Sequence, residues 1–517
     1  MATSVFPVPG VVHGKRILAT IIETRAKAGT NTEPWVSVPI DDSNISAGFR
    51  DITFQELNNA ANHAARWLSQ ALPATSQPFQ HFAYAGPKDL RYPLFALAAA
   101  KLQKVIVLPS PLLTREAQLR LLGQTNCELY LRPSEMVEQI SNVLRETPHV
   151  QQITVPGIED FFRNDEAAPV IYRNPKAITY TQQMMTTFDT AASLPDLEVN
   201  VVHHWARQRL YTPLPALHFI GMMATLSLTT CIHTTCVIGP PIPPTAELVT
   251  DILRYGNVAG ALINPALIDA LVLSQEGLQA LRELKYIHFV GASLSTKTGN
   301  LLAPYTHVIP AIGSTESGGY FTAIHENKDR WEYVSFQKDA GAELHHRMNG
   351  IHELVFVRGP QYRLQQIFQL YKDRQTFETN DLFVEHPEHK GMWKIIGRSD
   401  DYVYLAHGDG IHASLLEREI VAHPSVKSAL IGGLGRSVPV LLVELVPDAD
   451  AEDVDAVKRS LEPFIAKANE HCHDVVKLSS ERLIIAKKEK PFITTIKGNP
   501  LRLQTLSMYE AEIEALF

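Results

Sequence analysis

The sequence contains little cysteine, no excess of basic residues and no uninterrupted apolar run long enough to cross a membrane. Its four cysteines are scattered over 517 residues, which excludes a disulfide framework as the basis of the fold. The formal net charge of −8 excludes the basic surface typical of nucleic-acid binding. The most apolar stretch, residues 214–239, is interrupted by His218 and His233, and it therefore predicts a buried helix and strand.

The composition is that of an ordinary globular protein, with 45% hydrophobic and 20% charged residues. A chain of this length can form two or three domains. Residues 1–14 lack a basic region followed by a long apolar stretch, so they do not predict a secretory signal. We therefore expect a cytoplasmic enzyme with no nucleic-acid partner and no membrane partner.

Short apolar runs that end at glycine or proline predict an α/β fold. Residues 104–109 and 286–291 both have the pattern of buried strands. Such runs, followed by residues that start helices, are typical of mostly parallel sheets with flanking crossover helices. Ligands bind at the carboxyl ends of the strands in these sheets, and both Gly291 and Gly313 lie at such ends.

The pattern also predicts how the chain divides. Thr53 and Glu56 have the spacing of a capping box, which starts an amphipathic helix in a large first domain. Near residues 397–401 the pattern changes to that of a compact α+β unit. Its expected elements are helices over 415–422, 452–469 and 508–516, and strands over 428–431, 438–446 and 482–486. We place the boundary at Asp400, which gives domains of residues 1–399 and 400–517.

Two polar segments predict a nucleotide site. Gly313-Ser314-Thr315-Glu316 opens a loop directly after an apolar run. Glycine allows a close approach of the backbone to a ligand, hydroxyl groups can donate to phosphate, and a glutamate can hold Mg²⁺. Lys497 lies in a polar segment almost at the other end of the chain. This pairing predicts a nucleotide that one domain holds and that reacts with help from another.

Five segments in order resemble the motifs of the adenylate-forming superfamily, which includes acyl-CoA and aryl-CoA ligases and the adenylation domains of nonribosomal peptide synthetases. They are residues 217–221, 313–316, 379–382, 397–401 and 494–502. The C-terminal half is most similar to adenylation domains of fungal synthetase-like enzymes of the carboxylic acid reductase type. In that subfamily a carrier domain and a reductase or thioesterase domain usually follow. We therefore expect an excised domain or a stand-alone version of one.

The resemblance implies a reaction in which a carboxylate attacks the α-phosphate of ATP, with Mg²⁺ bound. It implies that Lys497 bridges the carboxylate and the α-phosphate, because positive charge is needed where negative charge grows. It implies that Thr315 donates a hydrogen bond to this phosphate and that Glu316 holds Mg²⁺, within the loop that Gly313 and Ser314 begin.

The resemblance also assigns the ribose contacts and a hinge. It implies that Asp381 accepts hydrogen bonds from the ribose hydroxyls and that Arg398 contacts the ribose or phosphate. Asp400 stands where this superfamily hinges between adenylation and thioester formation; a plain helix or turn cap is the alternative. The acyl acceptor would be the 4′-phosphopantetheine of a carrier domain, with free CoA as the alternative.

The resemblance further suggests the class of acid. Amino-acid-activating members place an aspartate near residue 218, whereas residues 214–230 contain none and His218 stands there. We therefore expect a carboxylic acid without an α-amino group, most favourably an aromatic one. The expected pocket residues are His218, Phe219, Met222, Phe289 and Gly291. For His218, a core histidine with a purely structural role is the alternative.

One segment departs from the superfamily's pattern. Members carry a phosphate loop that is rich in glycine, serine and threonine and ends in Pro-Lys. Here a predicted strand, residues 169–172, runs into Arg173-Asn174-Pro175-Lys176 without the glycine-rich stretch. Either the loop is deleted, or the sequence lacks a segment at this point. A true deletion should weaken ATP binding, and it leaves open a non-catalytic relative that binds a nucleotide or another ligand.

Overall fold

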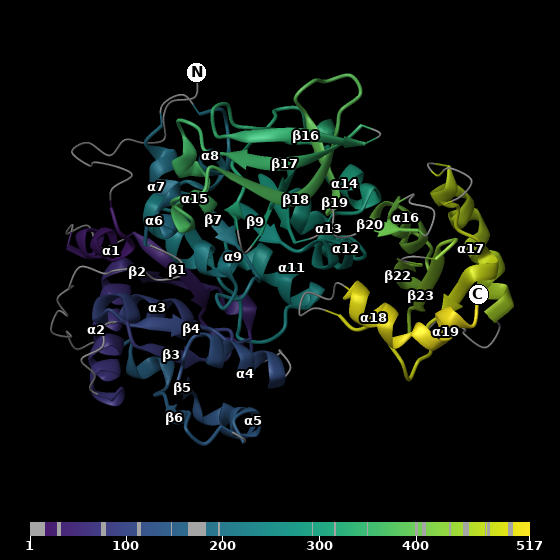
Figure 1. Cartoon of the computed structure of the whole chain (residues 1–517). Coiled ribbons are helices and arrows are strands. Elements are labelled where there is room, and N and C mark those ends of the chain that lie inside the picture. Colours follow the sequence, from purple (N-terminus) through teal and green to yellow (C-terminus); the bar gives the residue numbers. More distant parts are fainter. Residues whose placement is uncertain are drawn as a thin grey trace. The chain divides into compact units, whose positions relative to one another are not determined.

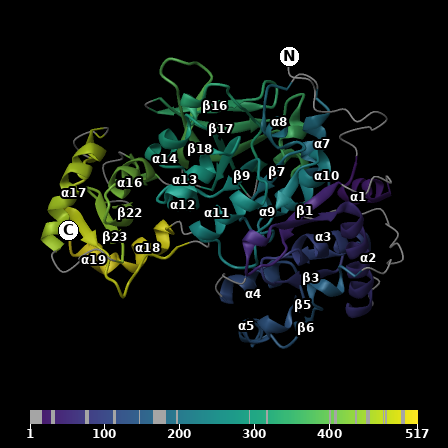
Figure 2. The same cartoon turned by 180° about the vertical axis from the view of Figure 1, so that it is seen from behind.

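A computed structural model places most of the chain (Figure 1; Figure 2 gives the view from behind). The structure describes residues 16–27, 33–73, 79–110, 115–145, 147–163, 182–194, 197–291, 293–314, 317–348, 350–398, 402–405, 410–433, 436–447, 454–470, 472, 476–494 and 500–517. The chain forms two compact units. The first contains residues 1–342 and 356–377, and the second contains residues 343–355 and 378–517. The predicted division at Asp400 stays a prediction.

A seven-stranded sheet is the centre of the first unit. Its strand order is β11-β10-β9-β7-β8-β1-β2. All neighbours pair in parallel except β1 and β2, which are antiparallel. The strands are β1 (Pro34–Pro39), β2 (Phe49–Thr53), β7 (Arg209–Tyr211), β8 (Thr235–Val237), β9 (Gly260–Ile263), β10 (Tyr286–Val290) and β11 (His307–Ala311). The mostly parallel α/β sheet expected from the sequence is confirmed.

A second, fully parallel sheet has the order β4-β3-β5-β6. Its strands are β3 (His81–Tyr84), β4 (Val105–Val107), β5 (Leu129–Arg132) and β6 (Gln151–Thr154). The predicted strand over residues 104–109 is therefore the edge strand β4. Figure 1 shows this sheet in blue, with α4 and α5 beside it.

Helices connect and cover these sheets. They are α1 (Leu18–Lys27), α2 (Phe54–Ala71), α3 (Arg91–Leu102), α4 (Arg115–Gln124), α5 (Val137–Val143), α6 (Gln182–Met185), α7 (Thr187–Ala192), α8 (Val201–Trp205), α11 (Ala246–Tyr255), α12 (Pro265–Leu271), α13 (Gln275–Arg282), α14 (Thr296–Leu302) and α15 (Ile367–Leu370). The capping box of α2 is confirmed, because Glu56 N donates to Thr53 Oγ1 and Thr53 N donates to Glu56 Oε2. Within the described part of the chain, no helix is long and apolar enough to span a membrane.

The apolar stretch 214–239 forms a buried helical segment and then β8, as predicted. The helical segment is α9 (Phe219–Met222), the π-helical turn η4 (Met223–Leu228) and α10 (Thr229–Ile232). Thr225 Oγ1 donates to the carbonyl of Gly221 at 2.9 Å, and Thr229 Oγ1 donates to the carbonyl of Thr225 at 2.7 Å. Such wide turns inside α-helices often occur at functional sites.

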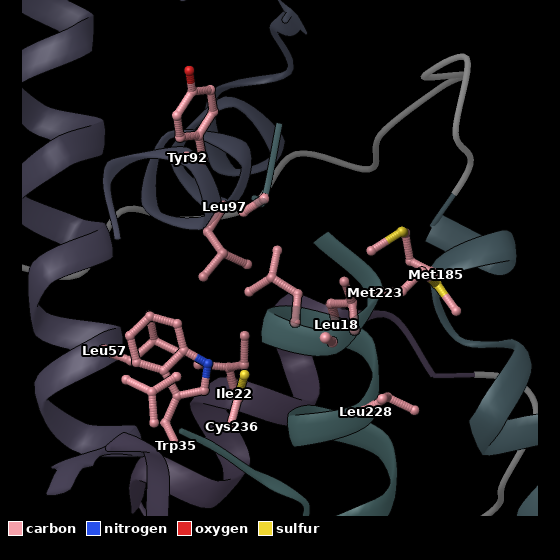
Figure 3. Packing of buried hydrophobic residues seen from close by; sticks show 14 of the residues in the cluster. Leu18, Ile22, Trp35, Leu57, Tyr92, Leu97, Met185, Met223, Leu228 and Cys236 are labelled. Carbon is pink, nitrogen blue, oxygen red and sulfur yellow. The ribbon is translucent and has the colours of Figure 1, made fainter. Parts of the chain in front are cut away.

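The largest apolar cluster fills the space between this helical segment, α1, α2 and the sheets. Figure 3 shows Leu18 and Ile22 of α1 together with Trp35, Leu57 and Met223. The Trp35 side chain is fully buried, and its indole N–H donates to the carbonyl of Thr225 at 2.7 Å. The four cysteines are all free thiols, and Cys236 is one of the residues inside this cluster.

In the second unit, the described residues form three sheets. The first has the order β16-β17-β18-β19, from β16 (Ala342–Met348), β17 (Ile351–Val357), β18 (Thr376–Glu385) and β19 (Trp393–Arg398). The next pairs β20 (Tyr402–Tyr404) with β21 (Gly410–His412), and the last contains β22 (Val426–Gly432), β23 (Val440–Leu445) and β24 (Leu483–Ile485). The helices are α16 (Ala413–Val421), α17 (Val454–Asn469), α18 (Arg502–Met508) and α19 (Glu510–Glu514).

The expected helix over residues 508–516 corresponds to the shorter helix α19, and α18 directly before it was not predicted. The two helices are separated at Tyr509, whose backbone is not helical (φ −97°, ψ 13°). The Tyr509 side chain is fully buried, and its hydroxyl group donates to the carbonyl of Lys490. Burial of this aromatic ring stabilises the bend. The other helices and strands expected between residues 415 and 486 are confirmed to within a few residues.

Candidate active site

Two glycines lie at the carboxyl edge of the seven-stranded sheet. Strands β10 and β11 are parallel neighbours, with Val290 opposite Ala311 at their last paired position. Gly291 follows β10 with φ +92°, a left-handed conformation that favours glycine. Gly313 follows β11 after one intervening residue. The prediction that both glycines lie at the carboxyl ends of parallel strands is confirmed, and their role in ligand binding stays a prediction.

Gly313 and Ser314 form the first strand, β12 (Gly313–Ser314), of a tight hairpin whose second strand is β13 (Gly318–Gly319). A Cβ atom on Gly313 would lie 2.4 Å from the carbonyl oxygen of Gly318, so only glycine fits. Ser314 Oγ accepts a hydrogen bond from Ser317 N at 3.1 Å and lies 2.7 Å from Ser317 Oγ. The hairpin is therefore a narrow, internally bonded loop with hydroxyl groups at its turn.

Several predicted site residues lie outside the described residues. These are Thr315, Glu316, Asp400 and Lys497, together with residues 169–177, which include the Pro-Lys pair. Their roles stay predictions. Among the residues that the structure does describe, no group of three or more His, Cys, Asp or Glu side chains could hold a metal ion.

Asp381 and Arg398 face each other across β18 and β19. Arg398 Nη1 lies 3.6 Å from Asp381 Oδ1, and the two side chains are 41% and 7% exposed. The backbone N–H of Asp381 donates to Thr379 Oγ1 at 3.0 Å, and Thr379 Oγ1 donates to the carbonyl of Leu354 at 2.8 Å. The second unit therefore holds a buried carboxylate at a fixed position, with a half-exposed cation beside it.

The backbone of β18 just before Asp381 depends on residues that the sequence did not reveal. Asn380 has φ +62°, a conformation that asparagine tolerates better than most residues. Its N–H donates to Glu353 Oε1 at 3.2 Å, and Glu353 Oε2 forms an ion pair with Arg347 Nη2 at 2.6 Å. No motif marks Glu353 or Arg347, because their role is apparent only when β16, β17 and β18 are placed side by side.

The described residues on both sides of Lys497 are anchored in the second unit. Thr494 and Pro500 form an isolated antiparallel β-bridge, and Leu501 N donates to the carbonyl of Ile493 at 2.7 Å. Further along, Arg502 forms a bidentate ion pair with Glu417 of α16.

His218 is the residue that precedes α9. Its N–H donates to the carbonyl of Pro215, and its carbonyl accepts from Met222 N, both at 3.0 Å. A Cβ atom on Gly221 would lie 2.2 Å from the carbonyl oxygen of Pro215, so the loop and helix approach closely at a glycine. The His218 side chain does not cap the helix and is only partly buried.

The predicted pocket residues divide between two apolar clusters. Phe219 and Met222 pack against the largest cluster. Phe289 is buried in another cluster, where its ring lies 6.0 Å from that of Trp331. Side chains alternate between the two faces of a strand, and the next residue of β10, Val290, packs against the largest cluster. The structure therefore does not group Phe289 with Phe219 and Met222, and Val290 is a residue that sequence reasoning missed.

Comparison with known proteins connects this geometry to a family. A family model described as "AMP-binding enzyme C-terminal domain" matches residues 400–517. A carboxylic acid reductase of Neurospora crassa is 27% identical over 98% of this chain and 51% of its own length. The adenylate-forming reductase Nps11 of Serpula lacrymans is 25% identical over 66% of this chain and 32% of its own length. The chain thus spans about half or less of the length of these relatives.

Solved structures show the same fold. ATP-bound MatB from Rhodopseudomonas palustris has a TM-score of 0.72 and 13% identity, with coverage of 96% of this chain and 100% of that one. A benzoate CoA ligase from Burkholderia xenovorans has a TM-score of 0.68 and 16% identity, covering 95% of this chain and 99% of that one. Residues 400–517 therefore match a family of AMP-binding enzymes, the chain is similar to fungal carboxylic acid and adenylate-forming reductases, and it has the fold of these ligases.

Proposed function

We propose that this chain activates a carboxylic acid with ATP, forms an acyl adenylate and releases pyrophosphate. The observation that carries the proposal is the hairpin of β12 and β13 at the carboxyl end of β11. Its glycines bring the backbone to where a ligand of a parallel sheet binds, and its serine hydroxyls lie at the turn. A loop with backbone N–H groups and hydroxyl groups in this arrangement can bind phosphate.

The proposed reaction transfers the AMP group of ATP to the carboxylic acid. A carboxylate oxygen of the acid attacks the α-phosphorus of ATP, the bond from that phosphorus to the bridging oxygen of pyrophosphate breaks, and pyrophosphate leaves. Lys497 supplies positive charge between the two anions, and Thr315 donates a hydrogen bond to the α-phosphate. Lysine suits this position because its ammonium is a compact charge with three donors.

Asp381 and Arg398 fit the remainder of the nucleotide. A buried carboxylate can accept hydrogen bonds from both ribose hydroxyls, and the half-exposed guanidinium beside it can contact ribose or phosphate. Glu316 provides the carboxylate oxygen that Mg²⁺ prefers, and the ion neutralises phosphate charge when bound. A nucleotide role accounts for a carboxylate in β18 that is only 7% exposed and lies beside a cation at the end of β19.

We propose an aromatic acid without an α-amino group as the substrate. His218 stands before α9 where an amino-acid-activating member would carry an aspartate, and Phe219, Met222 and Val290 pack on one apolar cluster. A ring suits such surroundings, whereas an ammonium group would lack a counter-charge from residues 214–230. The benzoate CoA ligase with the same fold acts on an acid of this kind, as its name states.

The acceptor in the proposal is the phosphopantetheine thiol of a carrier domain. The thiol attacks the acyl carbonyl, AMP leaves, and the thiol proton is released. Relatives named as reductases are longer than this chain, which supports a parent enzyme with a carrier domain and a downstream reductase or thioesterase. Asp400 is the proposed hinge between residues 1–399 and 400–517, and the proposed location is the cytoplasm.

An ATP–pyrophosphate exchange screen tests this function. Purified protein is offered benzoic, cinnamic, fatty and amino acids, and the acid that exchanges is then radiolabelled and offered to CoA and to a phosphopantetheinylated carrier protein. Exchange with an acid and label on the carrier support the proposal. Label on CoA alone would make the protein a CoA ligase. Nucleotide binding without exchange for any acid would overturn catalysis and identify a non-catalytic relative.

A further inference from the structure

Gln366 lies at the meeting point of three segments of the first unit. It stands directly before α15, and its side chain is almost completely buried. Its Nε2 donates to the carbonyl of Met184 in α6 at 3.1 Å and lies 3.8 Å from the sulfur of Met223 in η4. One amide group therefore contacts two helices that are far apart in the sequence.

The other end of this amide faces the hairpin. A Cβ atom on Gly318 would lie only 1.7 Å from Gln366 Oε1, so the amide packs directly against the glycine backbone. Gly318 also has φ +77°, which favours glycine independently. Gln366 Oε1 is buried and has no hydrogen-bond partner among the described residues. A buried oxygen without a partner has a cost in stability, so the hydrogen bonds of Gln366 do not account for its position by themselves.

Two of the three contacted segments belong to the proposed active site, and the third is bonded to one of them. Gly318 belongs to the hairpin of β12 and β13. Met223 starts the wide helical turn that continues the helix after His218. Met184 belongs to α6, and α6 is also tied to η4 because Ser227 Oγ donates to the carbonyl of Met185. Figure 3 shows Met185 and Met223 on neighbouring helices.

We propose that Gln366 is a positioning residue that sets the distance between the phosphate-facing hairpin and the acid-facing helix. The inference rests on the proposed function and adds a residue that none of the superfamily's five motifs includes. The Nε2 group of Gln366 holds α6 and η4 together. The flat face of the same amide sets how closely Gly318 approaches these two helices. Adenylation requires the acid and the α-phosphate to be held within van der Waals contact, and a displacement of about 1 Å can lower the rate by roughly 10²-fold.

The neighbouring glutamine provides a matched control. Gln365 is as buried as Gln366, its Nε2 donates to the carbonyl of Ala340 at 3.0 Å, and its Oε1 also has no hydrogen-bond partner among the described residues. The two side chains therefore lose the same chemical groups when each is replaced by methionine of similar size. Only Gln366 contacts the hairpin and the helix of the proposed site.

The test compares Gln366→Met and Gln365→Met in the full chain. Pyrophosphate exchange gives kcat and KM for ATP and acid, thermal unfolding gives the loss of stability, and hydrogen–deuterium exchange reports on the peptide that covers the hairpin. We expect Gln366→Met to lower kcat by about 10-fold or more and to increase deuterium uptake in the hairpin. We expect Gln365→Met to change kcat by less than about threefold at a similar Tm.

Equal loss of kcat in both variants, in proportion to Tm, would overturn the proposal, and so would unchanged hairpin exchange in Gln366→Met. The variant Gln366→Glu checks the Nε2 donor separately, because an ionised carboxylate keeps the shape but cannot donate to Met184, and above neutral pH it should not restore kcat. If the wild-type protein exchanged pyrophosphate with no acid, the proposed function would fail. Deuterium uptake would still decide whether Gln366 holds the hairpin.

Discussion

The Arg502 guanidinium and the Glu417 carboxylate form a mostly buried ion pair, with 2.9 Å between Arg502 Nη2 and Glu417 Oε2. The two side chains are 14% and 11% exposed. Arg502 Nη1 also donates to the carbonyl of Ile431 at 3.1 Å, and Ile431 N donates to Glu417 Oε1 at 2.6 Å. Three residues from α18, α16 and β22 thus fix the chain five positions after Lys497.

Loss of one member of this pair should destabilise the second unit. Arg502→Met leaves the Glu417 carboxylate buried without its cation, and we expect a loss of about 3–5 kcal/mol in the free energy of unfolding. Denaturant titration of the full chain measures this loss. The control is Arg436→Met, which breaks a more exposed pair with Glu510 and Glu514 and should change stability by about 1 kcal/mol or less. Equal effects of the two substitutions would contradict the prediction.

Lys497 should be required for adenylation and not for folding. We expect Lys497→Ala to lower the rate of pyrophosphate exchange by about 10²-fold or more, because it removes positive charge from the transition state. The melting temperature should stay within about 2 °C of the wild-type value. Lys488→Ala, at an exposed lysine nearby, is the control and should retain full activity. Near wild-type exchange by Lys497→Ala would refute the assignment.

Asp381→Asn should weaken nucleotide binding. The substitution keeps the shape of the side chain but removes the charge opposite Arg398 and one acceptor for the ribose hydroxyls. We expect KM for ATP to rise by about 10-fold or more, whereas KM for the acid should change little. Asp373→Asn, at an exposed aspartate, is the comparison for a carboxylate with no nucleotide role. A similar rise in KM for both variants would show that Asp381 does not contact the nucleotide.

Three histidines in the first unit should make its stability depend on pH. His204, His288 and His307 lie together, with ring centres 5.8 Å apart for His204 and His288 and 5.7 Å apart for His204 and His307. Burial, followed by the charge of His307, lowers the pKa of His204 from 6.5 to about 4. Burial also lowers the pKa of His288 well below its ordinary value. Both ring nitrogens of His288 lack a hydrogen-bond partner among the described residues.

The direction of this pH dependence follows from proton uptake on unfolding. Below pH 6.5 the unfolded chain protonates these histidines and the folded chain does not, so the free energy of unfolding falls as pH decreases from 6.5 towards 4. Each such histidine contributes up to about 1.4 kcal/mol per pH unit. Unfolding in urea between pH 7.5 and 5 should show this loss. His288→Leu should reduce the slope of the free energy of unfolding against pH by the equivalent of about one proton. His149→Leu, at an exposed site, should leave the slope unchanged. A slope that His288→Leu does not alter would exclude the cluster as its cause.

The parts that the sequence predicted are those with local signals. The capping box of α2 and the apolar runs of β4 and β10 depend on neighbouring residues, and the structure confirms them. Gly291 and Gly313 were each expected at the carboxyl end of a strand, and the structure places both there, after the parallel neighbours β10 and β11.

The parts that the sequence did not predict depend on contacts between distant segments. Phe289 was grouped with Phe219 and Met222 because all are apolar, but the face to which a strand residue points is set by the sheet. Gln366 had no signal, because a glutamine in a loop is usually a solvated residue. Its position became apparent only when α6, η4 and the hairpin were placed around it.

The class of acid should follow from the chemistry near His218. We expect benzoate- or cinnamate-type acids to exchange pyrophosphate well above phenylalanine. Burial of an aromatic ring among Phe219, Met222 and Val290 should stabilise the bound acid by about 2–3 kcal/mol. A buried α-ammonium group would instead cost several kcal/mol without a counter-charge, and a neutral imidazole cannot supply one.

A matched pair of acids makes this comparison sharp. Phenylalanine and 3-phenylpropanoic acid differ only in the α-amino group, so the ratio of their kcat/KM values isolates the cost of the ammonium. We expect the ratio to favour phenylpropanoic acid by about 10²-fold, which corresponds to about 2.7 kcal/mol. His218→Asp places a carboxylate at the N-terminal end of α9 and should shift the ratio towards phenylalanine. If phenylalanine is the better substrate of the wild-type protein, the acid is an amino acid and His218 has a structural role.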